Sequence, residues 1–245
     1  MGLATAKKLA LEGMNIIIVY RDPRIIEKDF LVEMEELRKT AGVEIRTFNV
    51  NALQKETIRN IVDEMKALLT GDNKVRVLLH SIARGNLKSL KPGNDQMTVE
   101  DFQGTIHAMG INIYEWVNEL LQHGLFAADA RVIALTSEGS SRTWPGYAAV
   151  GAAKSALENI CRSMASELAE FGIRTNVIQA GATETPSFKR IPGNELIKAD
   201  TLERNPFKRL TTPGDVANTV YLLCTDEASW INGALLHADG GEHCC

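Results

Sequence analysis

The chain has 245 residues, of which 44% are hydrophobic and 24% are charged, and 27 basic against 31 acidic residues give a net charge of −4. This length and composition are typical of a globular protein with a large buried core. The weakly acidic balance argues against a nucleic-acid-binding surface, no apolar run is long enough to span a membrane, and no signal peptide opens the sequence. We therefore expect one cytoplasmic domain that binds neither nucleic acid nor membrane.

Helical and strand patterns alternate along the first third of the chain. Charged amphipathic or helical patterns cover residues 3–13, 26–41 and 57–69, and short apolar runs predict strands at 16–20, 43–50 and 75–79. The run at 16–20 is continuously β-branched and ends in tyrosine, which predicts a strand buried on both faces. This alternation predicts an α/β fold with a doubly wound parallel sheet in a single domain over residues 1–245.

The sequence opens directly into a predicted helix at Gly2. In a dinucleotide-binding fold, a strand and a glycine-rich turn come before that helix, and Gly2 corresponds to the last glycine of the turn. Three explanations stay open: a sequence that starts late, replacement of the missing segment by residues elsewhere, or a remnant with weak or no cofactor binding. We favour the first explanation because the downstream motifs retain the residue types that the chemistry requires.

A strand followed by an alanine-rich helix, over residues 131–160, carries the strongest chemical signal. Tyr147 and Lys154 are seven residues apart, close to two helical turns, which places them on one face of a helix. A phenol beside a fixed cation suits the stabilisation of a developing oxyanion. An ordinary amphipathic helix with a surface tyrosine and lysine is the alternative that the spacing alone leaves open.

The residues around this pair resemble the short-chain dehydrogenase/reductase family, specifically its enoyl-[acyl-carrier-protein] reductase branch. Most of that family carries Tyr-x3-Lys, whereas Tyr147 and Lys154 form the Tyr-x6-Lys of the enoyl reductases, with Val150 at the usual tyrosine position. The segment from Ser137 to Arg142 is most similar to the NADPH-dependent reductase III type. The resemblance covers nearly the whole chain and implies a Rossmann-like sheet.

The resemblance also implies a reaction and its residues. It implies reduction of the C2=C3 bond of a trans-2-enoyl thioester, carried by acyl carrier protein or coenzyme A, in fatty acid metabolism. Tyr147 would protonate or hydrogen-bond the thioester oxygen, Lys154 would hold the nicotinamide ribose, and Ser137 would support them. A carbonyl or alcohol oxidoreductase of the same family, and a non-catalytic remnant or scaffold, stay open as alternatives.

The same comparison implies an NADPH site, with NADH as the alternative cofactor. Arg21 would bind the 2′-phosphate of NADPH. The neighbouring Asp22 is at the position where an acidic residue binds the ribose 2′-hydroxyl of NADH, or it could simply open a turn. The implied cofactor-binding residues are Gly2, Arg21, Asn49, Val50, Ser81, Ile82, Ala83, Lys154, Gly181, Thr183 and Thr185. Residues 186–204 would form a substrate lid, and the chain would assemble as a homotetramer or homodimer.

Four cysteines are too few and too scattered for a disulfide framework. Cys161 and Cys224 lie in helical patterns and are interpreted as small buried hydrophobic residues. The sequence Glu242-His243-Cys244-Cys245 lacks the spacing of a zinc site. The sequence therefore predicts no metal site.

Overall fold

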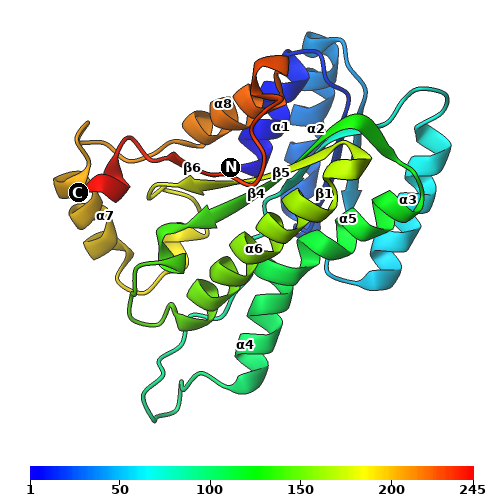
Figure 1. Cartoon of the computed structure of the whole chain (residues 1–245). Helices are drawn as coiled ribbons and strands as arrows, with labels where there is room; N and C mark the ends of the chain where they lie inside the picture. Colours follow the sequence, from blue (N-terminus) through cyan, green and yellow to red (C-terminus); the bar gives the residue numbers. More distant parts are fainter.

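Six parallel strands form the middle layer of the molecule and lie in two sheets (Figure 1). The computed structural model describes all residues, 1–245. The larger sheet has the order β3-β4-β5-β6, and the smaller one pairs β1 with β2. The strands are β1 (Ile16–Tyr20), β2 (Ile45–Asn49), β3 (Val75–His80), β4 (Phe126–Ser137), β5 (Ile173–Ala180) and β6 (Leu235–Ala238).

Helices cover both faces of the larger sheet (Figure 1). The helix α8 packs with α1 on one face, and α5 and α6 pack on the other. The helices are α1 (Gly2–Leu11), α2 (Arg24–Ala41), α3 (Lys55–Leu68), α4 (Val99–Ile106), α5 (Asn112–Gln122), α6 (Ala148–Glu167), α7 (Asn194–Arg204) and α8 (Pro213–Cys224). This confirms the predicted Rossmann-like fold, in which parallel strands are buried between helical layers.

The two hydrophobic clusters that hold these layers follow from the alternation of side chains along β4. Ile133 and Leu135 point to the cluster formed with α1 and α8. Val132 and Ala134 point to the cluster formed with α5 and α6. All four are at most 5% exposed, and burying a large aliphatic side chain contributes roughly 1.5–3 kcal/mol. The central strand is thus fixed from both faces, which fixes the position of its carboxyl end.

The strand β1 differs from the expectation that it is buried on both faces, because all five of its residues are partly exposed. It pairs in parallel with β2 along one edge, and no strand hydrogen-bonds to its other edge or to the outer edge of β3. Ile17 and Val19 of β1 and Val75 of β3 pack against one hydrophobic cluster, which is formed mainly by α3 and α5. The two sheets are therefore joined by apolar contacts rather than by a continuous hydrogen-bond ladder.

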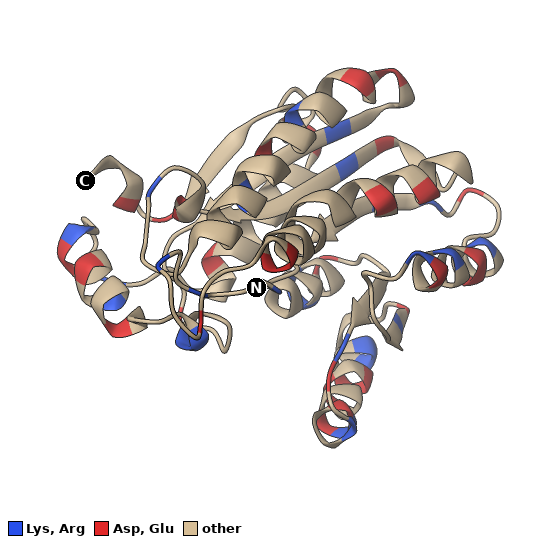
Figure 2. Cartoon of the chain, turned by 90° about the horizontal axis from the view of Figure 1, so that it is seen from below, with Lys and Arg blue, Asp and Glu red and all other residues tan.

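The surface helices carry intermixed charges (Figure 2). Ion pairs link α1 to α2 through Lys7 and Glu33, and Arg38 pairs with Glu35 within α2. Each exposed pair of this kind contributes only about 0–1 kcal/mol. No helix combines the length and apolarity that crossing a membrane requires. The predicted burial of Cys161 in α6 and Cys224 in α8 is confirmed.

Candidate active site

The carboxyl ends of the parallel strands meet at one edge of the molecule, where such folds bind ligands. At this edge β4 ends at Ser137, and a loop leads to α6. Tyr147 is the residue that precedes the first turn of α6, with φ −101° and ψ 4°. The sequence placed Tyr147 inside the helix, and the difference arises because Pro145 and the left-handed Gly146 (φ 75°) delay the helix until Ala148.

The hydroxyl groups of Tyr147 and Ser137 lie 3.4 Å apart, which is long for a hydrogen bond between hydroxyls. Burial raises the pKa of the Tyr147 phenol, and the contact with Ser137 opposes this only in part. The phenol is therefore protonated at neutral pH. Because its bond to Ser137 is loose, its proton is free to turn toward an oxygen atom of a ligand.

Lys154 lies two turns into α6, and its side chain is buried against the end of β4. Its Nζ donates a hydrogen bond to the carbonyl oxygen of Leu135 at 2.7 Å. Burial lowers its pKa to about 8, so the ammonium is charged at neutral pH but held with little solvation. A buried, partnered cation of this kind is suited to holding hydroxyl groups and stabilising negative charge.

His80 is a buried polar group that the sequence analysis did not assign to the site. It ends β3, is 4% exposed, and neither ring nitrogen has a hydrogen-bond partner. Burial and the charge of Lys154 lower its pKa to about 3. His80 is therefore neutral and adds no second positive charge beside Lys154.

Close packing between the loop after β4 and the start of α6 positions Tyr147. A Cβ atom added to Gly139 would lie 2.3 Å from Cε1 of the Tyr147 ring, and one added to Gly151 would lie 2.6 Å from the Gly139 carbonyl oxygen. Val150, which stands where most of the family carries tyrosine, is buried with Met109. The ring of Tyr147 packs against the same cluster. Between Ser137 and the end of α6, Tyr147 is the only tyrosine.

We predict that Gly139→Ala lowers kcat by about 10- to 100-fold, because relieving the 2.3 Å contact displaces the Tyr147 ring by about 1 Å. The KM for cofactor should stay within about 2-fold. Gly104→Ala in α4 is the matched control, since its Cβ enters open space. Steady-state kinetics of the two variants measures the effect, and equal kcat values would show that the Gly139 contact does not position Tyr147.

On the other side of β4, the predicted cofactor residues Gly2 and Ser81 lie together. A Cβ added to Gly2 would lie 3.1 Å from the Ser81 Oγ, so the start of α1 and the turn after β3 approach each other closely. Met1 makes no side-chain hydrogen bond to the first turn of α1. The free N–H groups at this helix start and the small residues around them fit a phosphate group. Ile82 and Ala83 continue the same turn.

The turn after β1 contains Arg21 and Asp22, both exposed. The Asn49 amide accepts a hydrogen bond from Asp22 N at 3.0 Å and donates one to Asp22 O at 2.9 Å. Asn49 therefore shapes this turn from the end of β2, and Val50 follows it at the surface. The Arg21 side chain makes no ion pair, and a cleft of about 600 Å³ lies between α1 and α2 beside Asp22.

The loop after β5 holds the remaining predicted cofactor residues. Thr183 is buried, and its hydroxyl donates to the carbonyl oxygen of Gly181 at 2.9 Å. The hydroxyl of Thr185 accepts a hydrogen bond from Phe188 N, at the start of the segment predicted as a lid. A Cβ added to Gly181 would lie 2.5 Å from Thr211 Oγ1, which explains why glycine stands there.

A charged network that the sequence did not reveal joins this loop to α7. The guanidinium of Arg204 donates to both carboxylate oxygens of Glu138, at 3.2 and 3.1 Å, and to Asp200 at 2.9 Å. Glu242 accepts from Thr201 in α7 and from Ala182 N. Its burial raises its pKa. Most residues of this network are far apart in the sequence. Only Asp200 and Arg204, four residues apart in a helix, have a spacing that indicates an ion pair.

Comparison with known proteins gives a family for this arrangement. The family model described as enoyl-(acyl carrier protein) reductase matches residues 1–243. The enoyl-[acyl-carrier-protein] reductase [NADH] FabI of Bacillus subtilis is 37% identical over 239 residues, covering 97% of this chain and 89% of that protein. The match therefore extends over the fold and all the site residues described above.

Solved structures agree in fold. The enoyl-[acyl-carrier-protein] reductase (NADH) of Aquifex aeolicus superposes with a TM-score of 0.84 and 27% identity, over 99% of this chain and 91% of that one. The enoyl-acyl carrier protein reductase of Bacillus cereus, solved with NADP⁺ and indole naphthyridinone, has a TM-score of 0.85 and 25% identity, over 99% and 91%. Similar chains thus include ones described with NADH and one bound to NADP⁺.

Proposed function

Because the chain belongs to the enoyl-(acyl carrier protein) reductase family, we propose that it reduces the C2=C3 double bond of a trans-2-enoyl thioester. The substrate class is an acyl chain carried by acyl carrier protein or coenzyme A in fatty acid metabolism. The observation that carries the proposal is the single protonated phenol, Tyr147, at the carboxyl end of β4. Ser137 and the buried cation of Lys154 lie at the same strand end.

The residues divide the chemistry as follows. When bound, the reduced nicotinamide supplies the hydride that C3 of the substrate receives. Negative charge then develops on the thioester oxygen, and Tyr147 donates a hydrogen bond or a proton to that oxygen. Lys154 would hold the ribose hydroxyl groups and keep a positive charge nearby, and Ser137 would have a supporting role beside the phenol.

The distance between the hydride acceptor and the oxygen favours Tyr147 over a tyrosine one turn later. In a carbonyl reductase both events occur at one C=O group, whereas C3 is separated from the thioester carbonyl oxygen by three bonds, C3–C2, C2–C1 and C1=O. Val150 occupies the later position, is 4% exposed, and packs against Met109 and Ala108. A valine supplies no proton, which supports enoyl reduction against carbonyl reduction or alcohol oxidation.

The described residues fit a nicotinamide dinucleotide. The uncapped start of α1 and the close approach of Gly2 to Ser81 suit a pyrophosphate, and Ile82 and Ala83 lie in the adjoining turn. Val50 borders the position expected for adenine, at the turn that Asn49 fixes. Gly181, Thr183 and Thr185 lie in the loop expected to hold the carboxamide and a phosphate.

We expect NADPH to be preferred over NADH because Arg21 is exposed and has no carboxylate partner, so that it is free to pair with a 2′-phosphate. Arg21→Ala should raise the KM for NADPH by about 10-fold or more and leave the KM for NADH nearly unchanged. Arg24→Ala, an exposed arginine three residues later, is the control. If the wild type prefers NADH, the cofactor contact at this turn would instead be a hydrogen bond from a ribose hydroxyl to the Asp22 carboxylate.

The function itself is tested by the oxidation of reduced cofactor with trans-2-enoyl and 3-oxoacyl thioesters in parallel. The proposal expects turnover with the enoyl substrates and at least about 100-fold less with the oxo substrates. The reverse order would make the chain a carbonyl reductase. Absence of turnover together with absence of cofactor binding by fluorescence would favour the scaffold alternative.

Two further features belong to this proposal. Residues 186–204, which contain α7, form the substrate lid, and the ion pairs of Arg204 with Glu138 and of Asp200 with Arg142 support a closed position. The exposed side chains of Leu222 (61%) and Trp230 (96%) support assembly into a homodimer or homotetramer. Light scattering of the purified chain measures that mass directly.

A further inference from the structure

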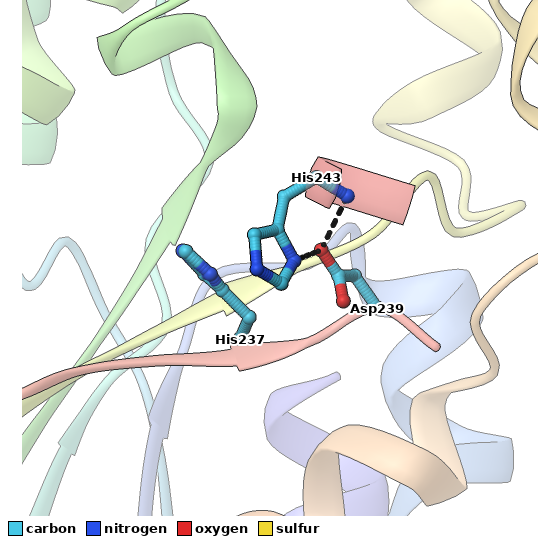
Figure 3. A group of neighbouring side chains, drawn as sticks. All are labelled: His237, Asp239 and His243. Carbon is cyan, nitrogen blue, oxygen red and sulfur yellow. Dashed lines mark hydrogen bonds and ion pairs between the residues drawn. The ribbon is translucent and has the colours of Figure 1, made fainter. Parts of the chain in front are cut away.

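His237, Asp239 and His243 converge at a place that the reaction does not use (Figure 3). His237 projects from β6, the edge strand of the larger sheet. The left-handed Gly240 (φ 63°) and Gly241 (φ 85°) then reverse the chain, so that the short 3₁₀ turn Glu242–Cys244 returns over this strand. One ligand atom from each of the three side chains lies within 4.8 Å of the others, and the two imidazole centroids are 3.7 Å apart.

Asp239 fixes the orientation and the tautomer of His243. This carboxylate is 3% exposed and accepts hydrogen bonds from Gly241 N at 2.9 Å, from His243 N at 3.1 Å, and from His243 Nδ1 at 2.7 Å. Because Nδ1 carries the proton, the lone pair of His243 is on Nε2. A carboxylate that holds one ring nitrogen while the other faces a ligand is the usual outer shell of a metal-binding histidine.

A thiol completes the set of donors. The Sγ of Cys244 lies 3.2 Å from the Nε2 of His243, and the side chains of Cys244, His243 and His237 are all accessible. Two donors on one zinc ion lie on the order of 3–4 Å apart, given bond lengths of about 2.0–2.3 Å. Binding of one ion would require His237 and Cys244 to rotate around the fixed His243, and both side chains are exposed.

The turn that presents His243 and Cys244 is anchored. The Glu242 carboxylate is 4% exposed and accepts hydrogen bonds from Thr201 and from Ala182 N. Arg204 donates to the main-chain oxygen of Glu242 at 2.9 Å. The donors consequently project from a rigid base, and solvent can enter to fill a fourth coordination position.

We propose that His237, His243 and Cys244 bind one divalent transition-metal ion of the zinc class, with Asp239 as the residue that positions His243. Imidazole and thiolate donors favour such ions over the oxygen-preferring Mg²⁺ and Ca²⁺. Upon binding, the thiol of Cys244 releases its proton to solvent and forms the metal–sulfur bond. The sequence alone did not suggest this site because His237 lies beyond a reversal of the chain from His243.

The test is calorimetric titration of the metal-stripped full chain with Zn²⁺, and spectroscopy with Co²⁺ as its substitute. The proposal expects one Zn²⁺ per chain, a higher Tm in its presence, and binding weakened at least about 100-fold in His237→Ala. Asp239→Asn should weaken it by about 10- to 100-fold. With Co²⁺, the sulfur charge-transfer band should vanish in Cys244→Ser and persist in the matched control Cys245→Ser.

Equal Zn²⁺ affinity of the wild type and His237→Ala would overturn the proposal, as would a sulfur band that survives in Cys244→Ser. Both His237 and Cys244 are exposed, so these variants are expected to fold, and unchanged circular dichroism verifies this. Because the readouts are metal affinity and absorption, the result is independent of reductase activity.

Discussion

Tyr147→Phe is expected to lower kcat for enoyl-thioester reduction by about 10²- to 10⁴-fold, the range that a positioned proton donor contributes. The substitution removes only the hydroxyl and keeps the ring that packs against the apolar cluster of Val150 and Met109. Burial raises the pKa of this phenol, so the wild-type group stays protonated through neutral pH. Cofactor affinity should change by less than about 2-fold, because the loss falls on the transition state.

Ser137→Ala is the informative companion to this substitution. Its hydroxyl contacts that of Tyr147 at a loose 3.4 Å, so a supporting role predicts a loss of only about 3- to 10-fold in kcat. Steady-state kinetics of the two variants, measured in parallel, compares the loss of kcat that each substitution causes. A larger loss in Ser137→Ala than in Tyr147→Phe would transfer the role of proton donor to Ser137.

Lys154→Met is expected to lower kcat/KM by about 10²- to 10³-fold while leaving the free energy of unfolding at neutral pH unchanged or higher. The activity falls because the site loses its fixed positive charge. Stability does not fall because methionine fills a similar volume without the cost of burying an ammonium. The lowering of the Lys154 pKa from 10.5 to about 8 corresponds to roughly 3 kcal/mol against the charged form in the folded state.

The sign of the pH dependence follows from the same shift. Between about pH 8 and pH 10.5 the unfolded chain keeps the Lys154 proton and the folded chain releases it, so this residue makes stability rise with pH. As the pH falls through 8 that increment is lost. Urea unfolding at both ends of this range should show the increment in the wild type and not in Lys154→Met. A variant that is several kcal/mol less stable at pH 7 would show that the Leu135 hydrogen bond outweighs desolvation.

The sequence was sufficient to predict the layered fold. Periodicity identified α2, α3 and the strands from β1 to β3 to within a few residues. That Tyr147 and Lys154 belong to one site remains a prediction from their spacing, and the tyrosine precedes the helix rather than lying within it. Local patterns predict local structure well because helix and strand periods depend on neighbouring residues alone.

Contacts between distant segments were not predictable in the same way. The partial exposure of β1 depends on which strand hydrogen-bonds to its edge, which a single apolar run does not encode. The burial of Glu242 under α7, and the convergence of His237 with His243, arise from chain reversals at glycines. Each glycine was visible in the sequence, but the partners that it brings together were not.

Enoyl reduction is tested most directly by the position of deuterium in the product after reaction of a trans-2-enoyl thioester with reduced nicotinamide cofactor deuterated at C4. Enoyl reduction predicts a saturated acyl thioester that carries deuterium at C3, formed in equal amount to the cofactor oxidised. Recovery of the enoyl thioester unchanged, together with deuterium at C3 of a 3-hydroxyacyl thioester when a 3-oxoacyl thioester is supplied instead, would contradict enoyl reduction and identify a carbonyl reductase.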